Sequence, residues 1–411
     1  MQIDADRLMH RLHQLGDSAR NPEGVLSRLA LSDEDKVGRE LIVGWMEEAD
    51  LTVSIDAIGN IFGTWGDGIA VQPLMIGSHI DSVVNAGIYD GCYGVLSGLA
   101  VIEALQEQDV EPVFPIVVAA FTNEEGNRYA PDMMGSLVHA GGLDLEQALN
   151  TKGIDGSILG EELQRIGFAG PMPVGTIKPR AYLELHIEQG PVLEVEGTSI
   201  GAVEDLQGIS WQEITIKGVA NHAGTTPTRL RHDAGLAAAR INTFLRDQLA
   251  SMSATTVATV GSIEYRPNVI NVIPSQVILT VDLRDPDDAR LKSAEAQFEE
   301  FVEELALQEA VTISIRRLAR FEPVQFDSEL VDAIEQAAEK RQLSCRRMTS
   351  GAGHDAQMMA RICPAAMIFV PSKDGISHNP GEHTDVQSLL QGSTVLLDIA
   401  RKLVAGRLLY R

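Results

Sequence analysis

Basic residues, cysteines and long apolar runs are all scarce in this sequence. Its 411 residues include 33 Lys and Arg against 58 Asp and Glu, a formal net charge of −25. Binding to nucleic acid or to an anionic membrane requires a basic surface, so this balance argues against both partners. No apolar run approaches the ~18 residues of a membrane span, and the charged, amphipathic N-terminus lacks the apolar core of a signal peptide. We therefore expect a soluble, cytoplasmic protein.

The cysteines indicate no site, and several common catalytic motifs are absent. Cys92, Cys345 and Cys363 are too few and too scattered for a disulfide framework or a cysteine-based zinc site. Cys92 is expected to be a small buried residue. The sequence also lacks G-x-x-x-x-G-K-[ST], H-E-x-x-H and C-x-x-C. The chemistry must therefore be sought among other residues.

The N-terminal part alternates helical and extended patterns. Ser32 followed by Asp35 indicates a capped helix, and the spacing of Val37, Leu41 and Trp45 predicts that they share its apolar face.

The strand patterns in this part predict a sheet. Residues 51–57 alternate as a half-buried strand, whereas 73–79 and 114–121 are nearly continuous apolar runs, typical of strands covered on both faces. A helix over 94–108 separates the last two. Strand, helix and strand in this order predict a right-handed crossover and a largely parallel central sheet.

A second block begins near residue 211. Its patterns are four strands and two helices in the order βαββαβ, with strands at 211–218, 256–263, 276–284 and 311–317. This order is that of a small ferredoxin-like domain. After about residue 325 the earlier alternation resumes. We expect a discontinuous catalytic domain, residues 1–210 and 325–411, interrupted by residues 211–324; one continuous α/β domain is the alternative.

Histidines and acidic residues follow the strand patterns, and these are His79, Asp81, Asp90, Glu124, Glu125, His186, Glu188 and His378. In an open α/β sheet, ligands bind outside the carboxyl ends of the strands, so these side chains could converge. A mixture of imidazole and carboxylate suits divalent cations, and paired cations usually share a bridging carboxylate. A single residue of this kind is more often a hydrogen-bonded loop residue than a ligand, and we expect that role for five other histidines, His10, His13, His139, His232 and His383.

Eight short motifs together identify a family. In chain order they are GSHIDSV, NAGIYDG, FTNEEG, ELHIEQG, NHAGTTP, NVIP, GAGHDA and GISHNP, between residues 77 and 383. The sequence resembles the N-carbamoyl-L-amino-acid hydrolase and allantoate amidohydrolase group of the aminoacylase-type dinuclear metallopeptidases over essentially the whole chain. The resemblance implies an α/β fold: a larger mixed-sheet catalytic domain holding two metals, with an inserted ferredoxin-like lid domain that also forms a homodimer.

The resemblance also implies roles for the site residues. The ligands of the two cations would be Asp90 as the bridge, His79 and His186 at one site, and Glu125 and His378 at the other. Glu124 would be the general base, since an unligated carboxylate can take a proton from water. Asp81 would fix the imidazole tautomer of His79. The cations would be Zn²⁺ or Mn²⁺, with Co²⁺ and Ni²⁺ as alternatives.

The resemblance places substrate contacts in both domains. Arg284 would bind the carboxylate of the substrate, with a geometry that suits guanidinium, and Asn271 would bind the same end. His222 would stabilise the oxyanion, either in its own subunit or across the dimer, and Gln189 would contact the ureido group. His354 and Asp355 would lie near the site without an implied role.

The reaction implied is hydrolysis of the ureido group of a small anionic substrate. An N-carbamoyl-L-amino acid, giving amino acid, carbon dioxide and ammonia, is favoured over allantoate or another ureido acid of purine breakdown. A dipeptidase or aminoacylase fits less well, because HIEQG and NHAGTTP resemble the ureido-hydrolysing branch. A non-catalytic binding protein with this fold is disfavoured because every site position is present.

Overall fold

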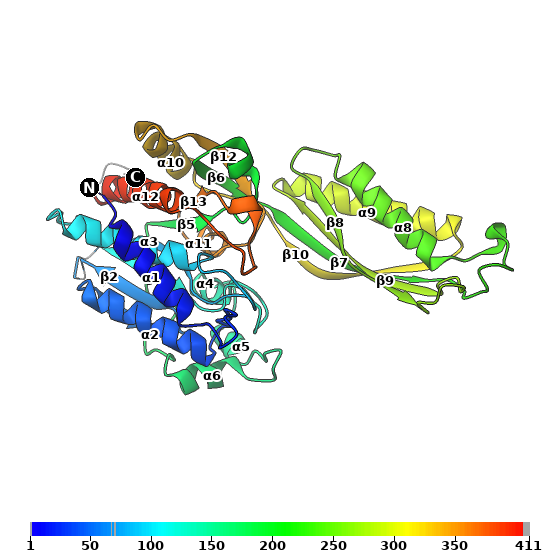
Figure 1. Cartoon of the computed structure of the whole chain (residues 1–411), viewed down its shortest axis with the longest axis horizontal. Coiled ribbons are helices and arrows are strands. Elements are labelled where there is room, and N and C mark those ends of the chain that lie inside the picture. The colour runs from blue at the N-terminus through cyan, green and yellow to red at the C-terminus, as the bar shows by residue number, and fades with distance from the viewer. Residues whose placement is uncertain (1, 67, 70, 406–411) are drawn as a thin grey trace. The chain divides into compact units, whose positions relative to one another are not determined.

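The computed structural model describes residues 2–66, 68–69 and 71–405, which divide into two compact units (Figure 1). The first comprises the described residues up to 204 and from 325 onward, and the second comprises residues 205–324. The sequence places the first boundary slightly later, at 210/211. Across the described residues, no helix combines the length and the apolar character needed to cross a membrane.

A nine-stranded mixed sheet forms the centre of the first unit, in the order β1-β2-β4-β3-β5-β13-β6-β11, with β12 paired to β6. The strands are β1 (Thr52–Ile55), β2 (Ile61–Trp65), β3 (Leu74–His79), β4 (Ile116–Phe121), β5 (Ala181–Ile187), β6 (Ile200–Leu206), β11 (Val324–Gln325), β12 (Cys345–Ser350) and β13 (Ala365–Val370). The four central strands β4, β3, β5 and β13 are parallel, whereas β1, β2 and β6 join the sheet antiparallel. The sheet is therefore mixed, with the predicted parallel arrangement at its centre.

Helices cover both faces of this sheet. They are α1 (Ala5–Asp17), α2 (Asp33–Glu48), α3 (Cys92–Gln106), α4 (Met134–His139), α5 (Leu145–Leu149), α6 (Leu159–Ile166), α7 (Val192–Glu196), α10 (Ser328–Lys340), α11 (Asp355–Met359) and α12 (Val386–Val404), with a 3₁₀ turn η3 (Lys373–Gly375). Successive side chains of β5 point to opposite faces: Glu184 bonds to the first turn of α11, and Leu185 packs against Gly392 of α12. All residues of β3, β4, β5 and β13 are buried in consequence, as their apolar sequences predict.

The buried face of α2 differs from the prediction. Ser32 caps the helix by accepting from the backbone N–H of Asp35, but Val37 is 42% exposed. The helix instead buries Asp35 and Arg39 together with Trp45. The Arg39 guanidinium bonds to the Asp35 carboxylate at 2.7 Å, so a charge pair occupies positions that an apolar pattern cannot reveal.

The second unit is a four-stranded antiparallel sheet in the order β10-β7-β9-β8. Its elements are β7 (Gly208–Lys217), η1 (Thr228–Leu230), α8 (Ala234–Phe244), the π-turn η2 (Leu245–Leu249), β8 (Val257–Arg266), β9 (Gln276–Asp285), α9 (Asp288–Gln308) and β10 (Thr312–Phe321). Figure 1 shows α8 and α9 along one face of this sheet. Alternate residues of β9 from Val277 to Leu283 pack into a core that includes Ile241 of α8 and Phe298 of α9. The residues between them, including Asp282 and Arg284, lie on the other face.

Candidate metal centre

The carboxyl ends of the parallel strands bring five of the predicted residues together. His79 ends β3, Glu124 and Glu125 follow β4, and His186 lies next to the end of β5. His378 follows β13 and η3. Because these strands are parallel, their carboxyl ends meet at one edge of the sheet.

Asp90 completes the cluster from the loop before α3. Its Oδ1 lies 3.1 Å from Nε2 of His186 and 3.5 Å from Nε2 of His79, and its Oδ2 lies 3.3 Å from Nε2 of His378. The Oε2 of Glu125 lies 3.4 Å from the same atom of His378. Two groups with metal-ligand spacing result, Asp90 with His79 and His186, and Asp90 with Glu125 and His378. The structure thus places Asp90 in both groups.

Backbone carbonyls orient the two buried imidazoles. The Nδ1 of His79 lies 2.9 Å from the carbonyl oxygen of Asp81, and the Nδ1 of His186 lies 2.8 Å from that of Ile187. A carbonyl oxygen can only accept, so each Nδ1 carries the proton and each Nε2 presents a lone pair. The amide of Gly91 donates to the Nε2 of His186 at 3.0 Å, which agrees with this tautomer. Both lone pairs are directed at the cluster around Asp90.

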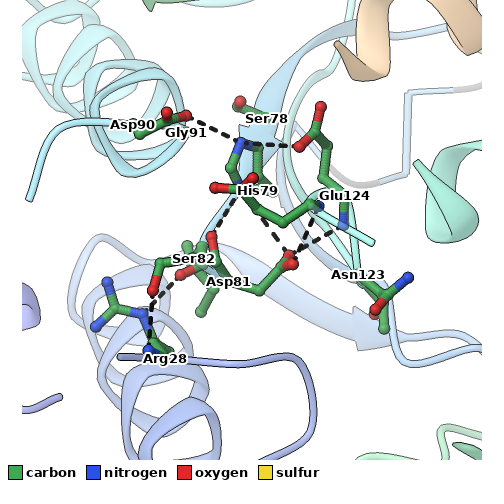
Figure 2. Close-up of polar contacts among 12 residues, drawn as sticks. Arg28, Ser78, His79, Asp81, Ser82, Asp90, Gly91, Asn123 and Glu124 are labelled. Carbon is green, nitrogen blue, oxygen red and sulfur yellow. Dashed lines mark hydrogen bonds and ion pairs between the residues drawn. The ribbon is translucent and has the colours of Figure 1, made fainter. Parts of the chain in front are cut away.

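The side chain of Asp81 has a different partner from the one predicted. Its carboxylate lies 3.9 Å from the Nδ1 of His79 and instead accepts from the backbone N–H groups of Glu124 and Glu125, at 3.1 and 3.2 Å. Figure 2 shows this side chain directed at the Glu124 backbone, with Glu124 and Asp90 on either side of the His79 ring. The carbonyl of Asp81 fixes the tautomer, and its carboxylate fixes the turn that carries the two glutamates.

Left-handed backbone recurs in the loops of the site. Asn123, Gln189 and His378 have φ angles of 57°, 58° and 52°. Non-glycine residues adopt this region at a cost and mainly where the surrounding structure imposes it. Asn123 is held by its side-chain amide, which donates to the carbonyls of Tyr129 and Pro131. Each loop thereby turns its neighbouring side chain back toward the strand ends.

Crowded carboxylates dominate the electrostatics. Burial, followed by the charge of Asp90, raises the pKa of Glu125 to about 8. Burial and the nearby carboxylates of Asp355, Glu125 and Asp81 raise the pKa of Glu124 well above its usual range, although His79 opposes them. At Asp90, burial also favours the neutral form, but the three neighbouring histidines outweigh it and lower the pKa strongly. The site therefore crowds several carboxylates in a place where water cannot stabilise their charged forms.

These residues fit a pair of divalent cations. Two imidazole lone pairs and the Asp90 carboxylate face one position, and two carboxylates and a third imidazole face the other. Buried Oε1 of Glu125 and Oε1 of Gln189 have no hydrogen-bond partner among the described residues. Such oxygens are costly unless something binds them. A third group, Glu184 with His186 and His354, fits less well because Ser78, Tyr182 and the amide of Ala356 already donate to Glu184.

Other predicted residues have mixed outcomes. The amide of Gln189 donates to Oδ2 of Asp90 at 2.7 Å, so it lies within the cluster. Glu188 does not, because both its oxygens accept from backbone N–H groups at the start of α7. His354 packs against His186, with ring centroids 4.6 Å apart, and Asp355 accepts from Ser136 behind them. Cys92 is buried, as expected, and accepts from Arg28.

The sequence analysis missed two residues that shape the site. Glu382 accepts from the backbone of Tyr89 and Asp90, and its position four residues after His378 was the only signal. Arg28 is fully buried and donates to the carbonyls of Ile80 and Leu15, and no motif contains it.

His222 and Asn271 lie side by side in the second unit. His222 forms an isolated bridge with Val272, and the amide of Ala223 donates to the carbonyl of Asn271 at 2.9 Å. The Nδ1 of His222 accepts from the amides of Gly224 and Thr225 at 3.0 and 3.2 Å. An accepting Nδ1 places the proton on Nε2, which makes this exposed imidazole a hydrogen-bond donor.

Arg284 lies at the other end of the same strand from Asn271. Asn271 precedes β9, whereas Arg284 is next to its last residue, where it pairs with Asp282 at 2.9 Å. At about 3.3 Å per residue, β9 from Gln276 to Arg284 spans roughly 26 Å. One chain therefore cannot direct both residues to the same carboxylate of a small molecule.

Comparison with known proteins places the fold and site in a family. Peptidase family M20/M25/M40 matches residues 75–402, which include every residue of the cluster. The chain belongs to this family. It is 40% identical over 399 residues to an N-carbamoyl-L-amino-acid amidohydrolase of Rhizobium meliloti, covering 96% of this chain and 95% of that protein. An allantoate amidohydrolase of Escherichia coli K12 is 35% identical over 387 residues, covering 93% and 94% of the two chains.

A solved structure agrees over the whole length. An amidase of the hydantoinase/carbamoylase family from Burkholderia multivorans superimposes with a TM-score of 0.94 at 43% identity, covering 97% of both chains. The M20-type mixed α/β fold follows from this agreement together with the family match, and the resemblance inferred from the eight motifs is confirmed.

Proposed function

We propose that this chain is a metal-dependent amidohydrolase that hydrolyses the ureido group of N-carbamoyl-L-amino acids. The observation that carries the proposal is the shared position of Asp90 in two adjoining groups of metal-ligand spacing, beside the carboxylate of Glu124. The names of the relatives support the ureido substrate. An allantoate substrate is the alternative, since one relative acts on it and both substrates offer a carboxylate and a ureido group.

Five residues would hold the two cations. His79, His186 and Asp90 would hold one cation, and Glu125 and His378 would hold the second with Asp90 as the bridge. When bound, Zn²⁺ or Mn²⁺, or alternatively Co²⁺ or Ni²⁺, would supply Lewis-acid polarisation and a more acidic water.

Glu124 would act as the general base. It takes a proton from the attacking water and delivers it to the departing nitrogen, so the C–N bond breaks to release the amino acid and carbamate, which decomposes to carbon dioxide and ammonia. Burial raises the pKa of Glu124, which makes it a stronger base than an exposed carboxylate. The Asp81 carboxylate accepts from the backbone N–H of Glu124, which fixes the backbone position from which the Glu124 side chain extends.

Recognition of the substrate would fall to Gln189 and the second unit. Gln189 is positioned by Asp90 and has a buried oxygen available for the ureido N–H groups. Arg284 would bind the substrate carboxylate as a planar fork. The Nε2–H of His222 would donate to the developing oxyanion, an interaction of a kind worth about 3–4 kcal/mol.

The length of β9 supports a homodimer formed through the second unit, acting as a ferredoxin-like lid. Since Arg284 and the pair of His222 and Asn271 are separated by the strand, one active site would take Arg284 from one subunit and the pair from the other. Mixing Arg284→Ala and His222→Ala proteins tests this when activity is assayed far below KM, where both variants turn over slowly, because each mixed dimer would regain one intact site. About a quarter of wild-type activity should return on equilibration. No recovery, with mixed dimers verified by mass spectrometry, would contradict shared sites.

Ammonia release by metal-reconstituted protein tests the function itself. N-carbamoyl-L-amino acids, their D-enantiomers, N-carbamoyl-β-alanine and allantoate should be compared at equal concentration. The proposal expects the L-carbamoyl compounds to give the highest kcat/KM. Preference for allantoate would establish the alternative, and release from none of them would refute a ureidohydrolase.

Glu124→Gln tests the assignment of the base. The variant keeps the size of the side chain but cannot take a proton, so kcat should fall by about 10²–10⁴. Metal content by mass spectrometry should stay at two ions per chain, because Glu124 is not among the proposed ligands. Near-normal turnover would remove Glu124 as the base.

A further inference from the structure

Glu382 connects two loops that carry proposed ligands. It is 7% exposed, and its Oε1 accepts from the backbone N–H groups of Tyr89 and Asp90, at 3.0 and 3.3 Å. Its Oε2 accepts from the hydroxyl of Ser377 at 3.2 Å. Ser377 precedes His378 directly. One carboxylate therefore reaches the backbone of the bridging residue and the loop of a second ligand.

Ser377 completes this connection on the other side. Its hydroxyl also lies 3.1 Å from Oδ2 of Asp90, the oxygen that faces His378. A closed set of contacts among Asp90, Ser377 and Glu382 thus surrounds the second group of proposed ligands, which contains Asp90 and His378. In the group of Asp90, His79 and His186, backbone carbonyls orient both imidazoles, so Asp90 is the member of that group that contacts Glu382.

The loop before Asp90 is shaped around this side chain. A Cβ added at Gly87 would lie 2.3 Å from Oε1 and 2.5 Å from Cβ of Glu382. No side chain fits there, so the backbone at Gly87 packs directly on Glu382. The carboxylate is therefore part of the loop's interior.

The group formed by Asp90, Glu125 and His378 needs contacts that order its loops. His378 is 49% exposed and has a left-handed backbone, whereas His79 and His186 are held within or at the end of central strands. A ligand on an exposed loop loses conformational freedom when it binds a cation. Contacts that order the loop beforehand reduce that cost and raise the affinity.

We propose that Glu382 is a positioning residue for the cation site formed by Asp90, Glu125 and His378. It orders the loops of two of the three ligands without touching the cation. This inference rests on the metal centre proposed above, and it predicts unequal effects on the two cations. A general contribution to folding would weaken both sites alike or neither.

Calorimetric titration of metal-free, full-length protein with Mn²⁺ measures both affinities. Glu382→Ala should weaken the second cation by about 10- to 100-fold, the range found when a group that supports a ligand is removed, and leave the first within about threefold. Glu382→Gln keeps an oxygen for the two amides and should restore most of the affinity. Electron paramagnetic resonance should show loss of the spin-coupled Mn²⁺ pair at intermediate loading in Glu382→Ala alone.

Asp327→Ala provides the matched control. Asp327 also accepts two backbone N–H bonds, at 3.0 and 3.1 Å, but at the start of α10. Its own amide bonds to the first residue of β13, Ala365, at the end of that strand opposite to His378. The control should leave both Mn²⁺ affinities unchanged. If Glu382→Ala does not fold by circular dichroism, Glu382→Asp carries the test with the same expectation, since it withdraws the oxygens by one carbon.

The outcomes separate the inference from the function. If the wild-type protein binds two Mn²⁺ ions, three results would overturn the role of Glu382 alone. They are an equal loss of affinity at both sites in Glu382→Ala, no loss of affinity in that variant, and the same loss of affinity in Asp327→Ala. Fewer than two ions in the wild-type protein overturns the metal centre and this inference with it. Selective loss of the second ion, restored by Glu382→Gln, supports both.

Discussion

Replacing Arg39 by methionine should destabilise the first unit more than any surface change. Arg39 is 1% exposed and donates to the Asp35 carboxylate, to the carbonyl of Gly59 and to the hydroxyl of Thr122. Methionine keeps the apolar length of the side chain but leaves the Asp35 charge buried without a partner. Breaking one side of a buried ion pair costs about 3–5 kcal/mol.

The double variant sharpens this prediction. Asp35→Asn removes the stranded charge while its remaining oxygen can still accept from the amide of Leu31, which lies 2.7 Å from the Asp35 carboxylate. The hydroxyl of Thr122 and the carbonyl of Gly59 then still lack the donors that Arg39 supplied, and an unpaired buried carbonyl costs about 1–3 kcal/mol. Adding Asp35→Asn to Arg39→Met should therefore recover about 1–3 kcal/mol. A second mutation that restores stability is the signature of an unpaired charge.

Urea unfolding followed by tryptophan fluorescence measures both variants. Trp45 and Trp65 report on the first unit, and Trp211 lies in the second. Trp211→Phe as the common background confines the signal to the first unit, where the substitutions act. Metal-free protein avoids stabilisation by bound cations. An Arg39→Met protein within about 1 kcal/mol of the background, or a double variant less stable than the single one, would refute the reasoning.

Three further predictions follow from local geometry. Gly91→Ala should abolish Mn²⁺ binding by calorimetry, since φ is 64° and the new Cβ would lie 2.4 Å from the ring of His79; Gly141→Ala, with φ of 72° and open space, is the control that should bind normally. Arg284→Ala should raise KM for carboxylate substrates with little change in kcat, and an unchanged KM would contradict its role. Burial raises the pKa of all three cysteine thiols, to about 12 at Cys363, so iodoacetamide at pH 8 should label the native protein far more slowly than the urea-unfolded one by mass spectrometry.

The strand patterns predicted the centre of the fold because they report burial directly. Residues 73–79 and 114–121 are nearly continuous apolar runs, and the structure covers β3 and β4 on both faces. The face of α2 was wrong for the same reason, since an apolar count overlooks a buried pair such as Asp35 and Arg39. The role of the second unit as a lid and dimer interface remains a prediction.

The motifs located the cluster because most of the proposed ligands lie at or after the carboxyl ends of strands. They could not show what holds the ligands, since those contacts join distant segments through backbone groups. Asp81 illustrates the limit: its spacing from His79 suggests a bond between side chains, whereas its carboxylate reaches the amides of Glu124 and Glu125 across two strand ends. Motifs assign roles to residue types, but they do not show which backbone groups these residues contact.

The same limit applies to the proposed sharing of a site between subunits, a question that the sequence left open for His222. Asn271 and Arg284 are near neighbours in the sequence and both read as ligands for one carboxylate. In a helix, the same stretch would rise about 1.5 Å per residue, but in β9 it rises about 3.3 Å, and the two side chains end at opposite ends of the strand. If both contact one small substrate, the second copy of the chain must supply one of them. Because β9 is extended, a shared role for Asn271 and Arg284 in binding one substrate requires a dimer.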